Sequence, residues 1–273
     1  TAVGWHGHLA LRFRRDAART LAHDVHDGPL RVLKALYPEG DAVCHHVLVH
    51  PPGGIAGGDR LDVEITLEPG AHALITTPGA SRYYRSSGQA ALQAVQAHVQ
   101  EGARLEWLPM TAIAYDGCIA ENRVRFVLDA GAQMIGIDLL ALGLPASHAP
   151  FARGRFTQHL EWPGQWLERG VIDAGDARLL QSALGLGGHR VMATLWCASG
   201  SAWPGAQRDT LLDAARDGAG PFEGSTAPTP GLVLWRALGN AVEPLWARAV
   251  AVRGRWRERC WGLAPEPPRV WST

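Results

Sequence analysis

Acidic residues are the side chains of this sequence that could take part in acid–base catalysis or metal binding, and they are scattered along the chain rather than clustered. Two carboxylates at a fixed separation can act as acid and base on a glycosidic bond, and carboxylate oxygens also bind divalent cations. The spacing singles out no pair among Asp59, Glu106, Asp116, Asp138, Glu161 and Glu168. Asp138 stands apart because it lies in the apolar run MIGIDLLALG, where a carboxylate needs a buried polar partner or a polar channel.

A glycine-rich loop follows two prolines at residues 50–60, with the sequence HPPGGIAGGDR. Its glycines let the backbone turn tightly and leave the amide groups open to a close ligand such as an anion. The loop has neither a G-x-G-x-x-G pattern nor a lysine, which argues against a nucleotide site. The alternative interpretation is a structural turn fixed by Asp59 and Arg60.

A second loop, TTPGASRYYRSSG at residues 76–88, combines hydroxyl groups with arginine and tyrosine. This composition is typical of protein recognition surfaces, where tyrosine and arginine are enriched. The residues that we expect to take part are Thr76, Thr77, Arg82, Tyr84 and Arg85. A polar turn that buries its tyrosines is an equally good interpretation.

Several kinds of enzyme site are excluded by missing motifs. Lys34 is the only lysine and follows Leu33, so the sequence has no G-x-x-x-x-G-K-[ST] phosphate loop. It also has no G-x-S-x-G, S-x-x-K or H-E-x-x-H motif, and its four cysteines are far apart. On an extended strand, His46 and His50 would lie about 13 Å apart, too far to share one ion. We therefore expect no tightly bound metal or cofactor.

The composition narrows the class of protein further. The 26 basic and 26 acidic residues balance, so no net charge draws the chain to nucleic acid or to an anionic membrane. Hydrophobic residues make up 47% of the chain, which excludes a disordered protein, and 32 glycines with 18 prolines exclude a coiled coil. The N-terminal segment lacks a signal-peptide pattern, and the most apolar stretch is too short to span a membrane. We expect a cytoplasmic protein.

Tryptophan and arginine alternate near the C-terminus, where Trp246, Trp256 and Trp261 lie among arginines that include Arg257. Such a face can bind another protein, and stacked core packing explains it equally well. Binding of single-stranded nucleic acid would use the same residue types, but the neutral net charge argues against it.

A repeat of about 30 residues organises the middle of the chain and must position these groups. Residues 60–67 (RLDVEITL) alternate between polar and apolar side chains, turn at Pro-Gly-Ala and continue into an apolar segment. This turn contains Gly70, and the same order of segments recurs around Gly102 and around Gly131. We predict a mainly β fold: a layered or β-helix-like body of many short strands. An ordinary β-meander is the alternative.

Helices are expected only in the second half, about two in number. Residues 207–217 form a good helical segment that stops at Gly218, and residues 232–261 are predicted to be helical with an interruption near Gly239. Nothing in the sequence suggests a linker between independent units. We therefore predict one domain over residues 1–273.

An ordered series of motifs resembles the UreD (UreH) family of urease accessory proteins. The first four are HPPGGIAGGDRL, ITTPGASRYYRSSGQAALQ, EGARLEWLPMTAIAYDG and LLALGLPASHAPFARG. The series continues through QWLERG, GLGGHRVMATL and RALGNAVEPLW to the closing PRVWST. The resemblance covers the chain from about Gly4 to its end.

This resemblance implies a non-enzymatic maturation factor with a β-helix-like fold and two helices. Family members bind the accessory protein UreF and, through it, the GTPase UreG, in an assembly that docks on apo-urease and contains a dimeric arrangement. Nickel passes transiently through such a complex to the urease active site. The residues that would line an internal polar path are Asp59, Glu106, Asp116, Asp138 and Glu168. The two loops and the segment with Trp256 and Arg257 would contact partners. The rival function is a β-solenoid carbohydrate-active enzyme that uses a carboxylate pair.

Overall fold

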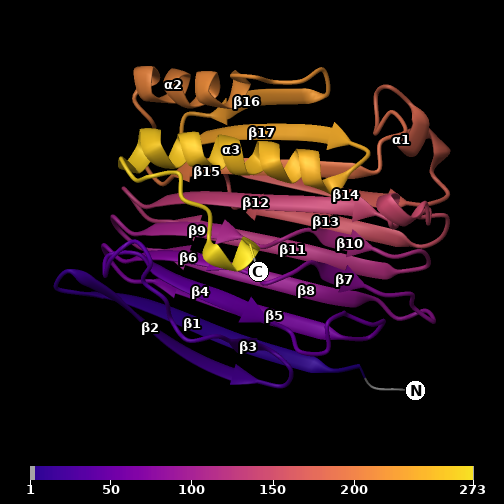
Figure 1. The fold of residues 1–273 in the computed structure, drawn as a ribbon, viewed down its shortest axis with the longest axis horizontal. Coiled ribbons are helices and arrows are strands. Elements are labelled where there is room, and N and C mark those ends of the chain that lie inside the picture. Colours follow the sequence, from indigo (N-terminus) through magenta and orange to yellow (C-terminus); the bar gives the residue numbers. More distant parts are fainter. Residues whose placement is uncertain (1–3, 273) are drawn as a thin grey trace.

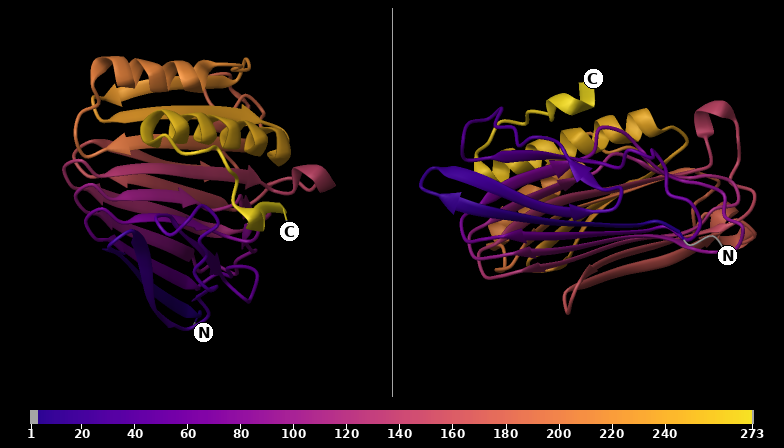
Figure 2. Two further views of the ribbon diagram at one scale, coloured as in Figure 1. Left: turned by 60° about the vertical axis from the view of Figure 1, so that its left-hand side comes forward. Right: turned by 90° about the horizontal axis from the view of Figure 1, so that it is seen from below.

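Two β-sheets face each other across an apolar interior, and helices cover the outer face of one of them (Figures 1 and 2). The structure is a computed structural model that describes residues 4–272. Within these residues the first sheet has seven strands and the second has ten. In spatial order the first sheet contains β14 (Trp166–Asp173), β13 (Arg155–Trp162), β11 (Ile119–Leu128), β8 (Ala91–Val99), β5 (Arg60–Leu67), β1 (His6–Asp16) and β2 (Arg19–Asp27).

The second sheet faces the first, and its strands alternate with those of the first sheet along much of the sequence. Its main order is β16 (Glu223–Thr229), β17 (Leu232–Gly239), β15 (Val191–Ser199), β12 (Gln133–Leu142), β9 (Arg104–Leu108), β6 (His72–Thr76), β4 (Cys44–Val49) and β3 (Arg31–Val32). Two short strands extend it, since β10 (Ala112–Ala114) pairs with β12 and β7 (Ser81–Tyr83) pairs with β10.

The sequence repeat forms a stack of coils. In the first sheet β5, β8 and β11 pair in parallel, and in the second sheet β6, β9 and β12 do the same. Each coil passes from one sheet to the other at Gly70, Gly102 or Gly131, all of which have a positive φ that glycine adopts without strain. A meander would pair successive strands antiparallel. The parallel pairing therefore confirms the layered, β-helix-like prediction.

Alternating side chains fill the space between the sheets. In β5, Leu61, Val63 and Ile65 are buried toward the interior, as their spacing predicts. The packing is close enough to require one glycine in a strand: a Cβ added to Gly136 would lie 2.0 Å from the Trp196 ring. This interior is continuous along the stack of coils.

Two helices cover the outer face of the second sheet, α2 (Gly205–Arg216) and α3 (Val242–Trp261) (Figure 1). A short helix α1 (Ala177–Gln181) and the 3-10 turns Pro145–Ser147 and Arg269–Ser272 lie elsewhere. The prediction that helices occupy the second half is confirmed. No helix within residues 4–272 combines the length and the apolar character needed to cross a membrane.

The predicted helix over residues 232–238 is wrong, because this segment is strand β17. It forms a hairpin with β16 and pairs with β15 along its whole length. Leu232 and Leu234 face the interior, while Val233 and Trp235 face the helices. A strand that is buried on both faces has no alternation of polar and apolar residues, so its sequence resembles a buried helix. The helix that follows begins at Val242 and ends at Trp261.

Candidate functional site

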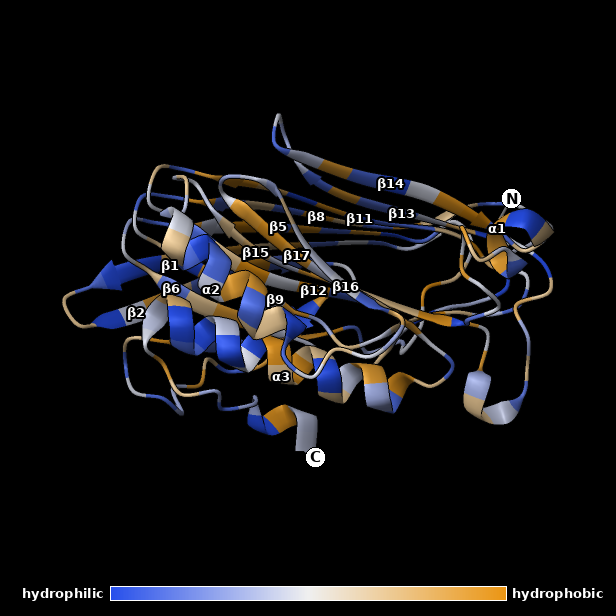
Figure 3. Cartoon of the chain, turned by 90° about the horizontal axis from the view of Figure 1, so that it is seen from above, coloured by the Kyte–Doolittle hydropathy of each residue, from blue (hydrophilic) through white to orange (hydrophobic). Residues whose placement is uncertain are grey.

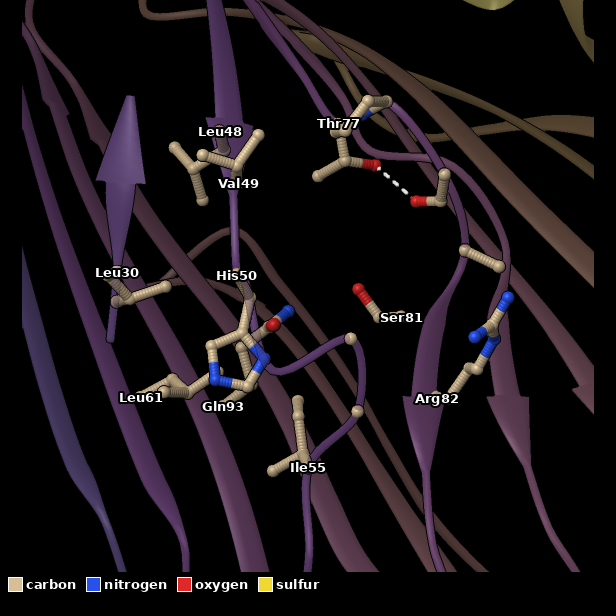
Figure 4. A pocket seen from close by; sticks show the side chains of 15 residues that line it. Leu30, Leu48, Val49, His50, Ile55, Leu61, Thr77, Ser81, Arg82 and Gln93 are labelled. Atoms are coloured by element: carbon tan, nitrogen blue, oxygen red, sulfur yellow. Dashed lines mark hydrogen bonds between the residues drawn. The ribbon is translucent and has the colours of Figure 1, made fainter. Parts of the chain in front are cut away.

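The two loops that the sequence highlighted lie together where the chain leaves β4 and β6 and leads into β5 and β8, and they line a cavity of about 270 Å³ (Figure 4). Leu30 and Leu61 lie on one side of the cavity, and Ser81 and Arg82 lie on the other. Gln93 contributes an amide group to the lining from β8. The cavity therefore joins an apolar wall to polar groups from the second loop.

Backbone contacts hold the loops against each other. The N–H of Ile55 donates to the carbonyl of Arg82 at 2.7 Å, and the N–H of Tyr84 donates to the carbonyl of Ile55 at 2.9 Å. A Cβ on Gly54 would lie 2.0 Å from the Tyr84 ring, so only glycine allows this approach. At this position the glycine-rich loop serves the packing of one loop on the other.

Three amide side chains form a row across the interior side of the first sheet. Asn122 on β11 is in register with Gln93 on β8 and with Gln158 on β13. Asp138 of β12 faces them from the second sheet. Gln158 Nε2 donates to Asp138 Oδ2 at 2.7 Å, and Asn122 Nδ2 lies 3.4 Å from the same oxygen. Gln93 Nε2 donates to Asn122 Oδ1 at 3.2 Å, which connects this row to the cavity lining.

Asp138 is a buried carboxylate whose hydrogen-bond donors are neutral. It is 5% exposed, and no basic side chain among residues 4–272 forms an ion pair with it. Burial raises the pKa of Asp138 to about 6; the nearby charge of Glu168 adds to the rise, and the amide hydrogen bonds oppose it. The Tyr83 hydroxyl is buried without a hydrogen-bond partner in the described structure, and burial together with the Asp138 charge raises its pKa.

Polar contacts continue past Asp138 to the far edge of the molecule. Thr194 on β15 is the register partner of Asp138, and its hydroxyl donates to Glu168 Oε1 at 3.4 Å. Arg236 Nε donates to Glu168 Oε2 at 3.0 Å. We define the interior polar band by its side chains, which are Gln93, Asn122, Asp138, Gln158, Thr194 and Glu168. The interior polar band thus leads from the cavity to the edge strand β14.

Apolar layers flank the interior polar band on both sides along the strands. On one side Phe126 stacks against Trp162 and Trp196, with ring centroids 5.8 and 6.0 Å apart. On the other side Phe156 meets the Tyr83 ring edge to face at 5.1 Å. These apolar layers separate the hydrogen-bonded band from most of the remaining interior.

The atoms of the interior polar band that could coordinate a metal ion are carboxylate, amide and hydroxyl oxygens. Such groups suit divalent cations, and sparse oxygen ligands hold a nickel ion less tightly than a cage of histidine and cysteine would. The described residues contain no group of three or more histidine, cysteine, aspartate or glutamate side chains placed to hold a metal ion.

Three of the predicted path residues, Asp59, Glu106 and Asp116, lie outside the interior polar band. The two oxygens of Asp59 accept the backbone N–H groups of Trp5 and Ala56, both at 2.8 Å. Asp116 accepts two backbone N–H groups and pairs with Arg153, which lowers its pKa. In the structure these two aspartates fix surface loops.

The predicted contact residues in and beside the loops divide into exposed and internal groups. The exposed side chains are Arg60, Arg82, Tyr84 and Arg85. Thr77 lines the cavity. Thr76 is buried, donates to the carbonyl of Leu108 at 2.6 Å and accepts a hydrogen bond from Trp271 Nε1 at 2.8 Å. Arg82, Tyr84 and Arg85 therefore offer the surface beside the cavity.

The arginine and tryptophan face of α3 points into the molecule, which corrects its interpretation as a contact surface. Trp256 and Arg257 are each 0% exposed. Glu106, on the outer face of β9, accepts Arg253 Nε at 2.8 Å and Arg257 Nε at 3.1 Å. Buried guanidinium groups require such a partner. Glu106 and Asp138 thus lie on opposite faces of one sheet and cannot act together as the carboxylate pair of a hydrolase.

Sequence reasoning missed several members of the site. Gln93, Asn122 and Gln158 occupy inward positions of alternating strands, where the neighbouring inward residues are apolar. A polar residue at an otherwise apolar inward position was the sequence signal that could have identified them. Thr194 and Arg236 had a weaker signal, because β15 and β17 are apolar on both faces and their sequences do not show which positions point inward.

The sequence is similar to known proteins over nearly its whole length. A model of the family described as UreD urease accessory protein matches residues 6–272. The protein named urease accessory protein UreD of Leptothrix cholodnii is 55% identical over 278 residues, which cover 99% of this chain and all of the relative. Those of Paracidovorax citrulli and Variovorax paradoxus are 53% and 52% identical, covering 98% and 99% of this chain and 99% and 100% of the relatives. The chain belongs to the UreD family of urease accessory proteins.

Proposed function

We propose that this protein is a urease maturation factor that works as a scaffold and chaperone without catalysing a reaction. It binds apo-urease and, through UreF, the GTPase UreG, in a dimeric accessory assembly in the cytoplasm. Nickel supplied by this assembly then reaches the urease active site. Membership in a family of urease accessory proteins supports the role in maturation.

The interior polar band is the proposed path of the nickel ion. The observation that supports it is continuity: hydrogen bonds and strand neighbours link the cavity at Gln93 to Asp138 and onward to Glu168. A buried carboxylate without a cation has an incomplete electrostatic environment, which a passing Ni²⁺ would complete. Because the oxygen ligands are few at each point, the ion is released again.

The surface beside the cavity is the proposed docking region for one of the protein partners. Arg82, Tyr84 and Arg85 are exposed there, and these residue types dominate binding energy at interfaces. A partner that docks on this surface would cover the cavity and place its own nickel site at the beginning of the path. Passage inside the assembly would keep the ion away from bulk solvent.

Reconstitution of urease activation tests both parts of the proposal. Apo-urease, UreF, UreG, GTP, bicarbonate and limiting nickel are combined with this chain or with its Asp138→Asn variant. Without the chain we expect little activation. With Asp138→Asn we expect the initial rate of activation to fall at least about fivefold, because the variant removes the central carboxylate of the path.

The matched control is Glu121→Gln, which removes a carboxylate from the outer face of β11 beside Asn122. This variant should activate urease as the unaltered chain does. Co-purification with UreF shows whether each variant still assembles. Equal activation rates for Asp138→Asn and the control, in intact assemblies, would reject the path. Equal activation with and without the chain would reject the maturation role itself.

A further inference from the structure

An ion pair joins the two sheets at the far end of the interior polar band. Glu168 belongs to β14, the edge strand of the first sheet, and Arg236 belongs to β17 in the second. Arg236 Nε donates to Glu168 Oε2 at 3.0 Å, and a terminal guanidinium nitrogen contacts the same oxygen. Figure 3 shows β14 and β17 in separate layers at this end of the molecule.

The space next to this ion pair is open. Gly170 on β14 is the register partner of Gln158, a member of the interior polar band. A Cβ added to Gly170 would meet no atom within 4 Å, and the residue is exposed. The band therefore reaches the surface beside Glu168, and the guanidinium of Arg236 stands at this opening.

Exposure makes the ion pair weak enough to be exchanged. The Arg236 side chain is 44% exposed and that of Glu168 is 24% exposed, so water and salt screen their attraction. A divalent cation attracts a carboxylate about twice as strongly as a singly charged group at the same distance. Arg236 can turn into solvent, since its long side chain already lies partly there.

We propose that Arg236 is a displaceable plug of the cation path, an inference that rests on the proposed function. In the empty path its guanidinium masks Glu168 and repels cations from the opening. A divalent cation that moves along the interior polar band displaces the guanidinium and takes its place on the carboxylate. A monovalent cation carries too little charge for this exchange, so the plug favours divalent cations.

Binding of Mn²⁺ to the full chain tests the plug. Mn²⁺ prefers oxygen ligands, whereas surface histidines would compete for Ni²⁺, and electron paramagnetic resonance reports the free ion. Arg236→Gln should bind Mn²⁺ roughly tenfold more tightly than the unaltered chain, because Glu168 is no longer masked. Arg236→Lys keeps the positive charge and should bind as weakly as the unaltered chain. The double variant Arg236→Gln/Glu168→Gln should lose the gain.

Two results would overturn the proposal: unchanged Mn²⁺ affinity in Arg236→Gln, or a gain that persists in the double variant. Circular dichroism checks that each variant is folded, and Arg236→Met carries the same expectation if Arg236→Gln is not. The test does not depend on urease activation. A path rejected by the Asp138→Asn assay would remove the role of the plug, whereas a plug rejected by Mn²⁺ binding would leave the path standing, so the two failures are distinguishable.

Discussion

The second sheet buries one carboxylate on each of its faces, and the two have different surroundings. On the outer face, Glu106 contacts Arg253 and Arg257, and its Oε1 lies 3.3 Å from His72 Nε2. On the inner face, Asp138 is hydrogen-bonded to amides alone within the described residues. Both side chains are almost completely inaccessible to solvent.

The difference appears in the pKa of each group. Burial opposes ionisation of Glu106, but the charge of Arg253 and the contacts with His72 and Arg257 outweigh it and hold its pKa well below the usual range. Burial of Asp138 has no such compensation and raises its pKa to about 6. The ion pairs of Glu106 hold α3 on the sheet. The uncompensated charge of Asp138 lowers stability, and a charge kept at such a cost supports the proposed path.

Removing the Glu106 carboxylate from its contacts with Arg253 and Arg257 should have the largest effect on stability. Glu106→Gln leaves two buried guanidinium groups without their shared anion, so we expect the free energy of unfolding to fall by about 3–5 kcal/mol. The pKa of Glu106 is lowered by folding, so its contribution is present above its ordinary pKa and is lost as the pH falls below it. Urea unfolding at neutral pH, followed by tryptophan fluorescence, measures the loss.

The control for this prediction is Glu121→Gln, whose partner Arg123 is 42% exposed. An exposed pair of this kind should contribute less than about 1 kcal/mol. A similar loss of stability in both variants would show that the buried cluster has no special role.

Removing the charge of Asp138 should raise the free energy of unfolding, the opposite of the effect expected at Glu106. Asp138→Asn keeps a side chain that can bond to Gln158 but removes the uncompensated charge, so we expect a gain of about 1–3 kcal/mol at pH 8. The same variant should impair nickel-dependent activation. A protein that becomes more stable and less active would place Asp138 among the residues kept for function.

The pH dependence of this gain follows from the raised pKa. Folded Asp138 holds its proton up to about pH 6, whereas the unfolded chain releases it near the ordinary value of 3.8. Stability from this group therefore falls as the pH rises between these values and stays low above them. The advantage of Asp138→Asn should shrink toward zero between pH 8 and about pH 4. An advantage that does not vary with pH would contradict the assignment.

The smallest effect is expected at Tyr83, whose buried hydroxyl lacks a partner in the described structure. Tyr83→Phe should leave the free energy of unfolding unchanged or raise it by up to about 1 kcal/mol. Trp256→Phe is the comparison on the other face of the sheet, because Trp256 Nε1 donates to the carbonyl of Leu211 at 2.8 Å. That variant should be clearly destabilised, and thermal unfolding of both distinguishes the cases.

The sequence contained enough information for the coils but not for every element. Alternation in residues 60–67 and the glycines at 70, 102 and 131 predicted strands that stack in layers, because both signals are local. The helix predicted over residues 232–238 is wrong because β17 is buried on both faces between β15 and β16, so its sequence lacks the alternation that marks a strand. Tertiary pairing decided that segment.

The site was predictable only in part, for a related reason. The apolar surroundings of Asp138 indicated a buried carboxylate, and its neighbours in the sequence carry that information. The role of Glu106 could not be read in the same way, because Arg253 and Arg257 are 147 and 151 residues away. The exposed face expected for Arg257 and Trp256 became a buried one through the same contacts.

Glu39 and Arg257 form an ion pair although 218 residues separate them. On the ribosome, Glu39 and Glu106 are made long before their arginines, which lie in α3 near the end of the chain. Until α3 emerges, both carboxylates lack their arginine partners, and the apolar side chains that α3 covers on the outer face stay exposed. The outer face therefore cannot complete its packing before α3 is synthesised, and a chain truncated before Val242 would have only α2 to cover that face.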